Sequence, residues 1–271
     1  MKISAKEIYN LRKKTGIGIM DCKKALIHSN GNINEAIRIL RKKGEKIAIN
    51  RSSFSMKNGA VIATVNSNYS CGTIIGVSCE TDFLSKSHEF IDFLSLLSKH
   101  SLSFNNKTNF LHSSYNEYQS VQEMIINKMG VVGEKLELKI FEKINSTFVM
   151  NYTHNNNRIA TLVGFSDKIN MSVAKDIAMH ITAMNPIAID EKEIPTLLMK
   201  DEIDLFENQI NKENKSDYTK KIMIQGKIKK FVSENTLINQ KFIKNNRITI
   251  RQYLDQYDKN LKINFFKRIS I

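Results

Sequence analysis

The 271-residue sequence lacks the features of secreted, membrane-spanning and disulfide-stabilised proteins. No stretch approaches the roughly 18 consecutive apolar residues that identify a membrane-spanning helix. The N-terminal segment "MKISAKEIYNLRKK" has no apolar core of a signal peptide. The three cysteines, Cys22, Cys71 and Cys79, are odd in number and widely spaced, which fits a reducing compartment and no disulfide framework. We therefore expect a cytoplasmic protein with no membrane partner.

Motifs for nucleotide binding, metal binding and catalysis are also missing. No glycine-rich run ends in Gly-Lys-Ser/Thr, which excludes a P-loop. The segment "GIGIMD" has only two glycines and follows an expected helix instead of a strand. The six histidines have no metal-ligand spacing, and His180 is expected to be a core residue. No pattern singles out a Cys/His catalytic pair, so we expect no enzyme activity and no cofactor.

A large excess of basic residues is the compositional feature that points towards nucleic acid. Lys and Arg number 41 against 27 Asp and Glu, giving a net charge of +14. The basic clusters "LRKKT", "LRKKGEK" and "KIKKF" are short, and no glycine-aromatic motif that stacks bases lies beside them. Abundant Lys, Asn and Ile are typical of A/T-rich codon usage. We expect no direct nucleic-acid contact, while a basic RNA-binding protein and an acidic protein partner both stay open.

The first 44 residues have the pattern of a small bundle of three helices. Two capping patterns, Ser4 with Glu7 and Asn32 with Glu35, precede apolar faces at helical spacing. The segments "TGIG" and "NGN" separate the helices, and Gly44 stands where the glycine that follows a helix is expected. Such a bundle could also be a module that binds ubiquitin-like proteins or nascent chains.

The rest of the sequence alternates between β-hairpins and helices. Runs over residues 59–79 and 146–165 each predict a hairpin, and each is followed by an apolar helical pattern. Residues 187–225 are polar and helical with a break at "NKENKS", which predicts an inserted antiparallel helical hairpin. The fold class is therefore α+β. The expected parts are residues 1–44 (helical bundle), 45–57 (linker), 58–144 (first core subdomain), 145–186 with 226–271 (second core subdomain) and 187–225 (helical hairpin).

The segment "CETDFL" marks a predicted strand-to-helix corner with an aromatic residue between charges. Thr81 or Asp82 could cap the helix, with Phe83 folded back onto it as a hydrophobic staple. Alternatively, Phe83 could be an anchor for another protein, since burying one Phe is worth about 1.5–3 kcal/mol. Chemistry alone favours the first interpretation, because caps are common and anchors are few.

Five stretches resemble, in order, translation elongation factor Ts, the guanine-nucleotide exchange factor for elongation factor Tu. They are "LRKKTGIGIMDCKKAL" (11–26), "TDF" (81–83), "YTHNNNRIATLV" (152–163), "DIAMHITAMNP" (176–186) and "GKIKKFVSENTLINQKFI" (226–243). The resemblance spans nearly the whole chain. It implies a three-helix domain like the ubiquitin-associated (UBA) domain, a two-subdomain α+β core with antiparallel sheets, and an inserted antiparallel helical hairpin.

The resemblance also implies a mechanism and its residues. The partner would be GDP-bound elongation factor Tu, whose Mg²⁺ is displaced by the segment Thr81, Asp82, Phe83 and Leu84, with Phe83 wedged into its G domain. Distorting the loops that hold Mg²⁺ and phosphate removes charge stabilisation from bound GDP. Further partner contacts are implied for Lys23, Val132, Gly133 and His154. A homodimer formed through the helical hairpin stays an open alternative.

The sequence departs from the family pattern at three places. Lys241 stands where the family usually has proline, and residues 155–157 replace a glycine-bearing turn with asparagines. Asn tolerates left-handed backbone, so the second hairpin is expected to survive. A further C-terminal helix of some relatives is expected to be absent.

Overall fold

The computed structural model confirms the α+β fold class. It describes residues 3–15, 17–52, 54–154, 156–213 and 215–271. The chain forms two compact units. The first contains Met1–Ile144, Thr153–Ala160 and Ile269–Ile271, and the second contains Asn145–Tyr152 and Thr161–Arg268. The domain boundaries expected from the sequence stay predictions.

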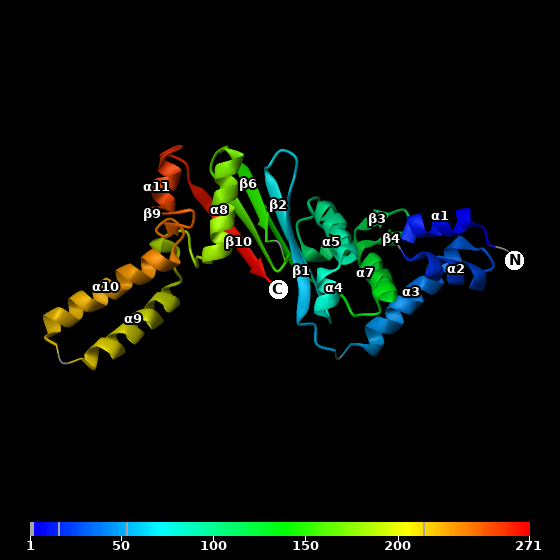
Figure 1. Cartoon of the computed structure of the whole chain (residues 1–271), viewed down its shortest axis with the longest axis horizontal. Helices are drawn as coiled ribbons and strands as arrows, with labels where there is room; N and C mark the ends of the chain where they lie inside the picture. Colours follow the sequence, from blue (N-terminus) through cyan, green and yellow to red (C-terminus); the bar gives the residue numbers. More distant parts are fainter. Residues whose placement is uncertain (1–2, 16, 53, 155, 214) are drawn as a thin grey trace. The chain divides into compact units, whose positions relative to one another are not determined.

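A bundle of three helices opens the first unit (Figure 1). The helices are α1 (Ala5–Thr15), α2 (Ile19–His28) and α3 (Ile33–Asn50). The predicted capping box is confirmed: the Ser4 N–H donates to Glu7 Oε2 at 2.7 Å, and the Glu7 N–H donates to Ser4 Oγ at 3.2 Å. Apolar side chains from all three helices, including buried Leu11, Leu26 and Leu40, form a separate core. Gly16, part of the expected break between the first two helices, lies outside the described residues.

Helix α3 is longer than the sequence predicts. It continues through Gly44 to Asn50, so the prediction that Gly44 ends the helix is wrong, and the expected linker begins as helix. Gly44 is buried where α3 packs on α7 (Val121–Val132). A Cβ on Gly44 would lie 1.9 Å from the carbonyl oxygen of Ile126. This glycine therefore serves a close helix crossing instead of a helix end.

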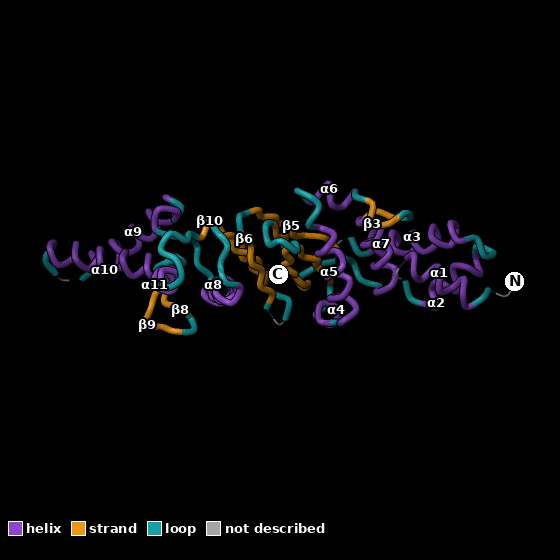
Figure 2. The backbone as a smooth tube through the Cα atoms, turned by 90° about the horizontal axis from the view of Figure 1, so that it is seen from above, coloured by secondary structure: helices purple, strands orange, loops and turns teal. Residues whose placement is uncertain are grey.

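A three-stranded sheet forms the core of the first unit. The hairpin of β1 (Asn58–Val65) and β2 (Cys71–Cys79) is confirmed, and β5 (Glu137–Asn145) completes the order β1-β2-β5. Every residue of the central strand β2 is buried. Helix α5 (His88–Ser101) packs against β1 and β2, and in Figure 2 it lies beside strands drawn in orange. It buries the predicted apolar face of Phe90, Phe93, Leu94 and Leu97.

Short elements connect the sheet to α7. They are α4 (Asp82–Lys86), α6 (Lys107–His112), β3 (Ser114–Asn116) and β4 (Gln119–Ser120). The helix predicted from about Glu117 begins only at Val121, since Ser120 and Glu123 form its capping box. The residues before Ser120 form the small β3–β4 hairpin instead.

The second unit is built on another three-stranded sheet, in the order β10-β7-β6. Its strands are β6 (Phe148–Thr153), β7 (Ile159–Phe165) and β10 (Ile263–Ser270), and the principal helix is α8 (Met171–Met184). The unit also contains a 3-10 helix η1 (Glu191–Glu193), β8 (Lys241–Phe242), β9 (Asn245–Thr249) and α11 (Ile250–Asp255). His180 is fully buried, as predicted.

Two helices, α9 (Thr196–Asn211) and α10 (Asp217–Asn235), form the predicted antiparallel hairpin (Figure 1). Helix α10 continues past Gly226, so the hairpin is longer than expected. Buried Val232 packs with Ala188 and Ile194 at its base. In the described part of the chain, none of the helices combines the length and the apolarity that crossing a membrane requires.

Candidate functional site

The predicted corner lies between strand β2 and helix α4. The strand ends at Cys79, and Thr81 has the extended backbone of an N-cap residue (φ −107°, ψ 152°). Its Oγ1 accepts a hydrogen bond from the Leu84 N–H at 3.3 Å. This bond satisfies one backbone donor that a helix start leaves without a partner. The prediction that this segment carries a helix cap is therefore confirmed.

Phe83 points to solvent instead of back onto its helix. It is 87% exposed, the highest fraction among the large hydrophobic side chains of the described residues. Leu84, its neighbour, packs against the core of the first unit, and Ser85 is buried. The staple interpretation is therefore wrong. Helix α4 packs against the core through Leu84, and the aromatic ring of Phe83 is left uncovered.

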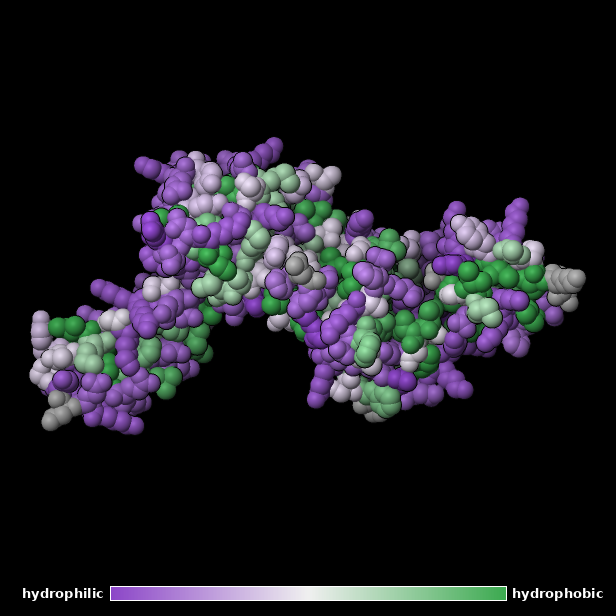
Figure 3. Space-filling model, viewed as in Figure 1, coloured by the Kyte–Doolittle hydropathy of each residue, from purple (hydrophilic) through white to green (hydrophobic). Residues whose placement is uncertain are grey.

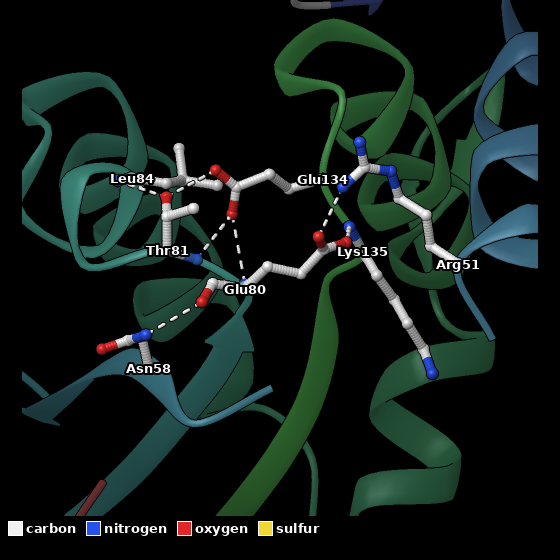
Figure 4. Close-up of polar contacts among 7 residues, drawn as sticks. All are labelled: Arg51, Asn58, Glu80, Thr81, Leu84, Glu134 and Lys135. Atoms are coloured by element: carbon white, nitrogen blue, oxygen red, sulfur yellow. Dashed lines mark hydrogen bonds and ion pairs between the residues drawn. The ribbon is translucent and has the colours of Figure 1, made fainter. Parts of the chain in front are cut away.

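The carboxylate of Glu134 holds the corner from the opposite side (Figure 4). Its Oε2 accepts the backbone N–H groups of Glu80 and Thr81, at 3.1 and 3.0 Å. Its Oε1 accepts the Thr81 hydroxyl at 2.5 Å. Hydrogen bonds to a charged acceptor are shorter and stronger than those between neutral groups. Glu134 thus fixes the chain two residues before Phe83.

A second carboxylate, Glu80, ties the same corner to its surroundings (Figure 4). Its Oε1 accepts the Lys135 N–H at 2.7 Å, and its Oε2 pairs with the guanidinium of Arg51, which caps the C-terminus of α3. The Glu80 carbonyl accepts from Asn58 Nδ2 at 2.9 Å. The Glu80 side chain is only 11% exposed. The corner is therefore anchored to the end of α3, the start of β1 and the segment after α7.

The residue directly before Phe83 is Asp82, which has a charged side chain. Asp82 is exposed and pairs with Lys86 at 2.9 Å, one helical turn later. The hydrogen bond from Lys86 and the charge of Lys86 hold the pKa of Asp82 below its ordinary value. A negative charge in the first turn of a helix is also favourable. Asp82 therefore presents a stable negative charge next to the exposed ring.

Cys79 lies beneath the corner and is unsuited to nucleophilic chemistry. Its thiol donates to the Thr81 carbonyl at 3.2 Å and is fully buried. Burial, with the nearby Glu134 carboxylate as the next cause, raises the pKa of Cys79 to about 12. Reactive cysteines have depressed pKa values instead. In the described residues, no group of three or more His, Cys, Asp or Glu side chains is arranged to hold a metal ion.

Two further predicted residues, Val132 and Gly133, lead directly into this corner. Val132 ends helix α7 and packs partly buried against the core of the first unit. Gly133 has φ +76° and caps the helix, donating its N–H to the Met129 carbonyl at 2.9 Å. Such a left-handed cap favours glycine. Because Glu134 follows immediately, the structure brings these predicted residues together with Thr81 and Phe83.

Lys23 and His154 lie on other elements of the first unit. Lys23 is exposed on α2, and Figure 3 shows hydrophobic side chains over α1 and α2. His154 is exposed at the tip of the β6–β7 hairpin, where its carbonyl accepts the Asn157 N–H at 2.7 Å. Asn157 has φ +53°, which confirms that an asparagine supplies the left-handed turn. Asn155 lies outside the described residues.

Sequence reasoning missed Arg51, Glu80 and Glu134. Arg51 stood in an expected linker, and the two glutamates had no local pattern that marked them. The Thr81–Glu134 bonds join residues 53 positions apart.

Comparison with known proteins gives a consistent result along the chain. The sequence profile of the family described as Elongation factor TS matches residues 80–271. Elongation factor Ts of Flavobacterium psychrophilum is 39% identical over 271 residues, covering 99% of this chain and 98% of that protein. The Elongation factor Ts proteins of Christiangramia forsetii and Amoebophilus asiaticus are 36% and 37% identical, each covering 100% of this chain and 99% of their own length. The chain therefore belongs to the elongation factor Ts family of translation factors.

Proposed function

We propose that the protein binds GDP-bound elongation factor Tu and accelerates the release of GDP, so that GTP can bind in its place. Family membership supports the choice of partner. The observation that carries the mechanism is the ring of Phe83, 87% exposed on a corner fixed by hydrogen bonds. An uncovered aromatic side chain on a fixed support has the properties of an interface anchor.

Phe83 acts as a wedge in the partner's G domain. Burying its ring recovers about 1.5–3 kcal/mol of hydrophobic free energy. Because the corner is already ordered, less conformational entropy is lost on binding. Asp82 brings its negative charge to the same place, where it competes with the diphosphate for Mg²⁺. GDP then loses charge stabilisation, since its phosphates depend on the bound cation and on the loops around it.

The remaining predicted residues extend the same interface. Lys23 and the exposed apolar side chains of α1 and α2 dock on the partner's G domain. Val132 and Gly133 approach beside the wedge, and His154 contributes from its hairpin. Thermodynamic linkage requires reciprocity, so GDP weakens binding of this protein by the same factor that the protein weakens binding of GDP. The overall nucleotide equilibrium is unchanged.

This role requires neither covalent chemistry nor a cofactor of the protein's own. The protein accelerates GDP release because part of its binding free energy distorts the loops of the partner that hold Mg²⁺ and phosphate. No direct contact with nucleic acid is part of the mechanism. Translation elongation places both proteins in the cytoplasm.

The test is the rate of release of fluorescent mant-GDP from elongation factor Tu. Phe83→Ala is expected to lower the accelerated rate about tenfold to a hundredfold, the equivalent of the burial energy of one Phe. Tyr218→Ala is a matched control, because Tyr218 is 76% exposed on α10 and outside the proposed interface. An unchanged rate with Phe83→Ala would overturn the wedge mechanism.

A further inference from the structure

We infer that Glu134 is a positioning residue, which sets the direction of the Phe83 ring without contacting the partner itself. This inference rests on the proposed function. It concerns the clamp formed by residues 80–81 and 134–135, in which each segment accepts backbone N–H groups from the other. Glu134 receives those of Glu80 and Thr81, while Glu80 receives that of Lys135.

Helix α4 cannot hold Phe83 by its own stability. It contains five residues, Asp82–Lys86, and an isolated helix of that length does not form in water. Its inner side is fixed by Leu84 and by buried Ser85. Its first turn depends on Thr81, whose backbone N–H and hydroxyl both bond to Glu134. The direction of the chain into Phe83 is therefore decided at Thr81.

Glu134 is itself held at both ends of its short segment. It follows the left-handed cap Gly133 of α7 and precedes strand β5, which begins at Glu137. Among the described residues, no Lys, Arg or His side chain pairs with Glu134, and its carboxylate accepts hydrogen bonds from the three donors at the corner. Its charge thus serves the corner and no other feature of the surface.

The bonds between Thr81 and Glu134 lie where they can orient the corner without adding much to the stability of the fold. Thr81 is exposed, and its bonds to Glu134 lie at the surface, above a core that Cys79 and Leu84 already fill. Surface hydrogen bonds add little to global stability, because water competes for the same groups. Removing the Glu134 carboxylate leaves the contacts of Glu80 with Arg51 and Lys135 in place, so it is expected to loosen the corner while the unit stays folded.

Three variants distinguish the role of the carboxylate. Glu134→Ala removes every acceptor. Glu134→Gln keeps a carbonyl oxygen for the two N–H groups, and its amide NH₂ can donate to the Thr81 hydroxyl, which has lone pairs to accept it. Glu134→Gln is therefore expected to restore most of the function. Glu137→Ala is the matched control, because Glu137 is an exposed glutamate three positions later.

The first measurement needs no partner. The sequence contains no tryptophan, so Phe83→Trp introduces a single tryptophan at the wedge position, which can be excited selectively beside the eight tyrosines. Its time-resolved anisotropy reports local motion of the side chain and of helix α4. Glu134→Ala is expected to increase the amplitude of fast motion, whereas Glu134→Gln and Glu137→Ala leave it unchanged. Equal amplitudes for Glu134→Ala and the parent would overturn the inference.

The second measurement is a double-mutant cycle on mant-GDP release. Glu134→Ala is expected to lower the accelerated rate about tenfold when Phe83 is present, because an unordered anchor must be ordered on binding. In the Phe83→Ala background it should have no further effect, since a positioning residue acts only through the residue that it positions. An equal loss in both backgrounds would overturn the inference.

The two proposals fail in different ways. If Phe83→Ala alone leaves exchange unchanged, the wedge mechanism fails, and the anisotropy measurement still decides whether Glu134 orders the corner. Should Glu134→Ala not fold, Glu134→Asp provides the same test, because its shorter side chain cannot reach all three donors. An Asp variant with parental anisotropy and parental exchange would contradict the inference.

Discussion

Gly44 of helix α3 and Gly130 of helix α7 face each other across a backbone-to-backbone helix crossing. A Cβ on Gly130 would lie 3.2 Å from the Gly44 nitrogen and 3.4 Å from its Cα. One on Gly44 would lie 1.9 Å from the Ile126 carbonyl oxygen. Helix α3 belongs to the three-helix bundle, and α7 leads to Glu134. The crossing of these two helices therefore packs the bundle tightly against the core of the first unit.

This crossing predicts that Gly44→Ala destabilises the protein. The added methyl group cannot be accommodated without moving one helix, and such overpacking typically costs about 1–3 kcal/mol. Gly226→Ala is the matched control inside α10, where a Cβ meets nothing within 4 Å. There, alanine should stabilise by about 0.5–1 kcal/mol, since glycine is costly in a helix interior. Calorimetry checks both, and a Gly44→Ala variant as stable as the parent would refute the crossing.

Buried His180 predicts a loss of stability in mild acid. Its Nε2–H donates to Gln240 Oε1 at 3.0 Å, and its Nδ1 accepts the Ile243 N–H at 3.3 Å, which fits a neutral ring. Burial lowers the pKa of His180, against an opposing effect of the Gln240 hydrogen bond. The unfolded chain therefore binds the proton more readily. Neutral, buried His180 therefore contributes to the free energy of unfolding. This contribution is fully present above the pKa of the unfolded chain, about 6.5, and is lost as the pH falls through the lower pKa of His180 in the folded protein.

Urea unfolding between pH 7.5 and 5.5 measures this effect. In His180→Asn the side chain no longer titrates, so its free energy of unfolding, although lower, should decline less with falling pH than that of the parent. Parallel pH dependences for the parent and His180→Asn would contradict the assignment of a buried neutral ring.

Cys79 is predicted to resist alkylation in the native protein. With a pKa of about 12, on the order of one thiol in ten thousand is ionised at pH 8, and the thiol is also buried. Treatment with iodoacetamide at pH 8, followed by mass spectrometry of the peptides, should find Cys79 unmodified until denaturant is added. Labelling of the native protein at the rate of a free thiol would show that the corner opens.

Much of the fold followed from patterns that depend on neighbours in the sequence. The Ser4–Glu7 capping box, the β1–β2 hairpin and the apolar face of α5 were each predicted where they occur. The Thr81 cap was one of two interpretations at its position. Gly44 was misjudged because a glycine that ends a helix and a glycine that admits another helix look alike in sequence.

The sequence by itself determined the fold class, the capped corner and, through motifs along the chain, the family. These properties depend on residue types at short spacings, and a capping threonine meets its backbone partner only three residues away. Only the tertiary structure decided that Phe83 faces solvent and that Glu134 fixes the corner. Both depend on which surfaces the packed elements leave uncovered and on hydrogen bonds that span 53 residues, and neither leaves a local signature in the sequence.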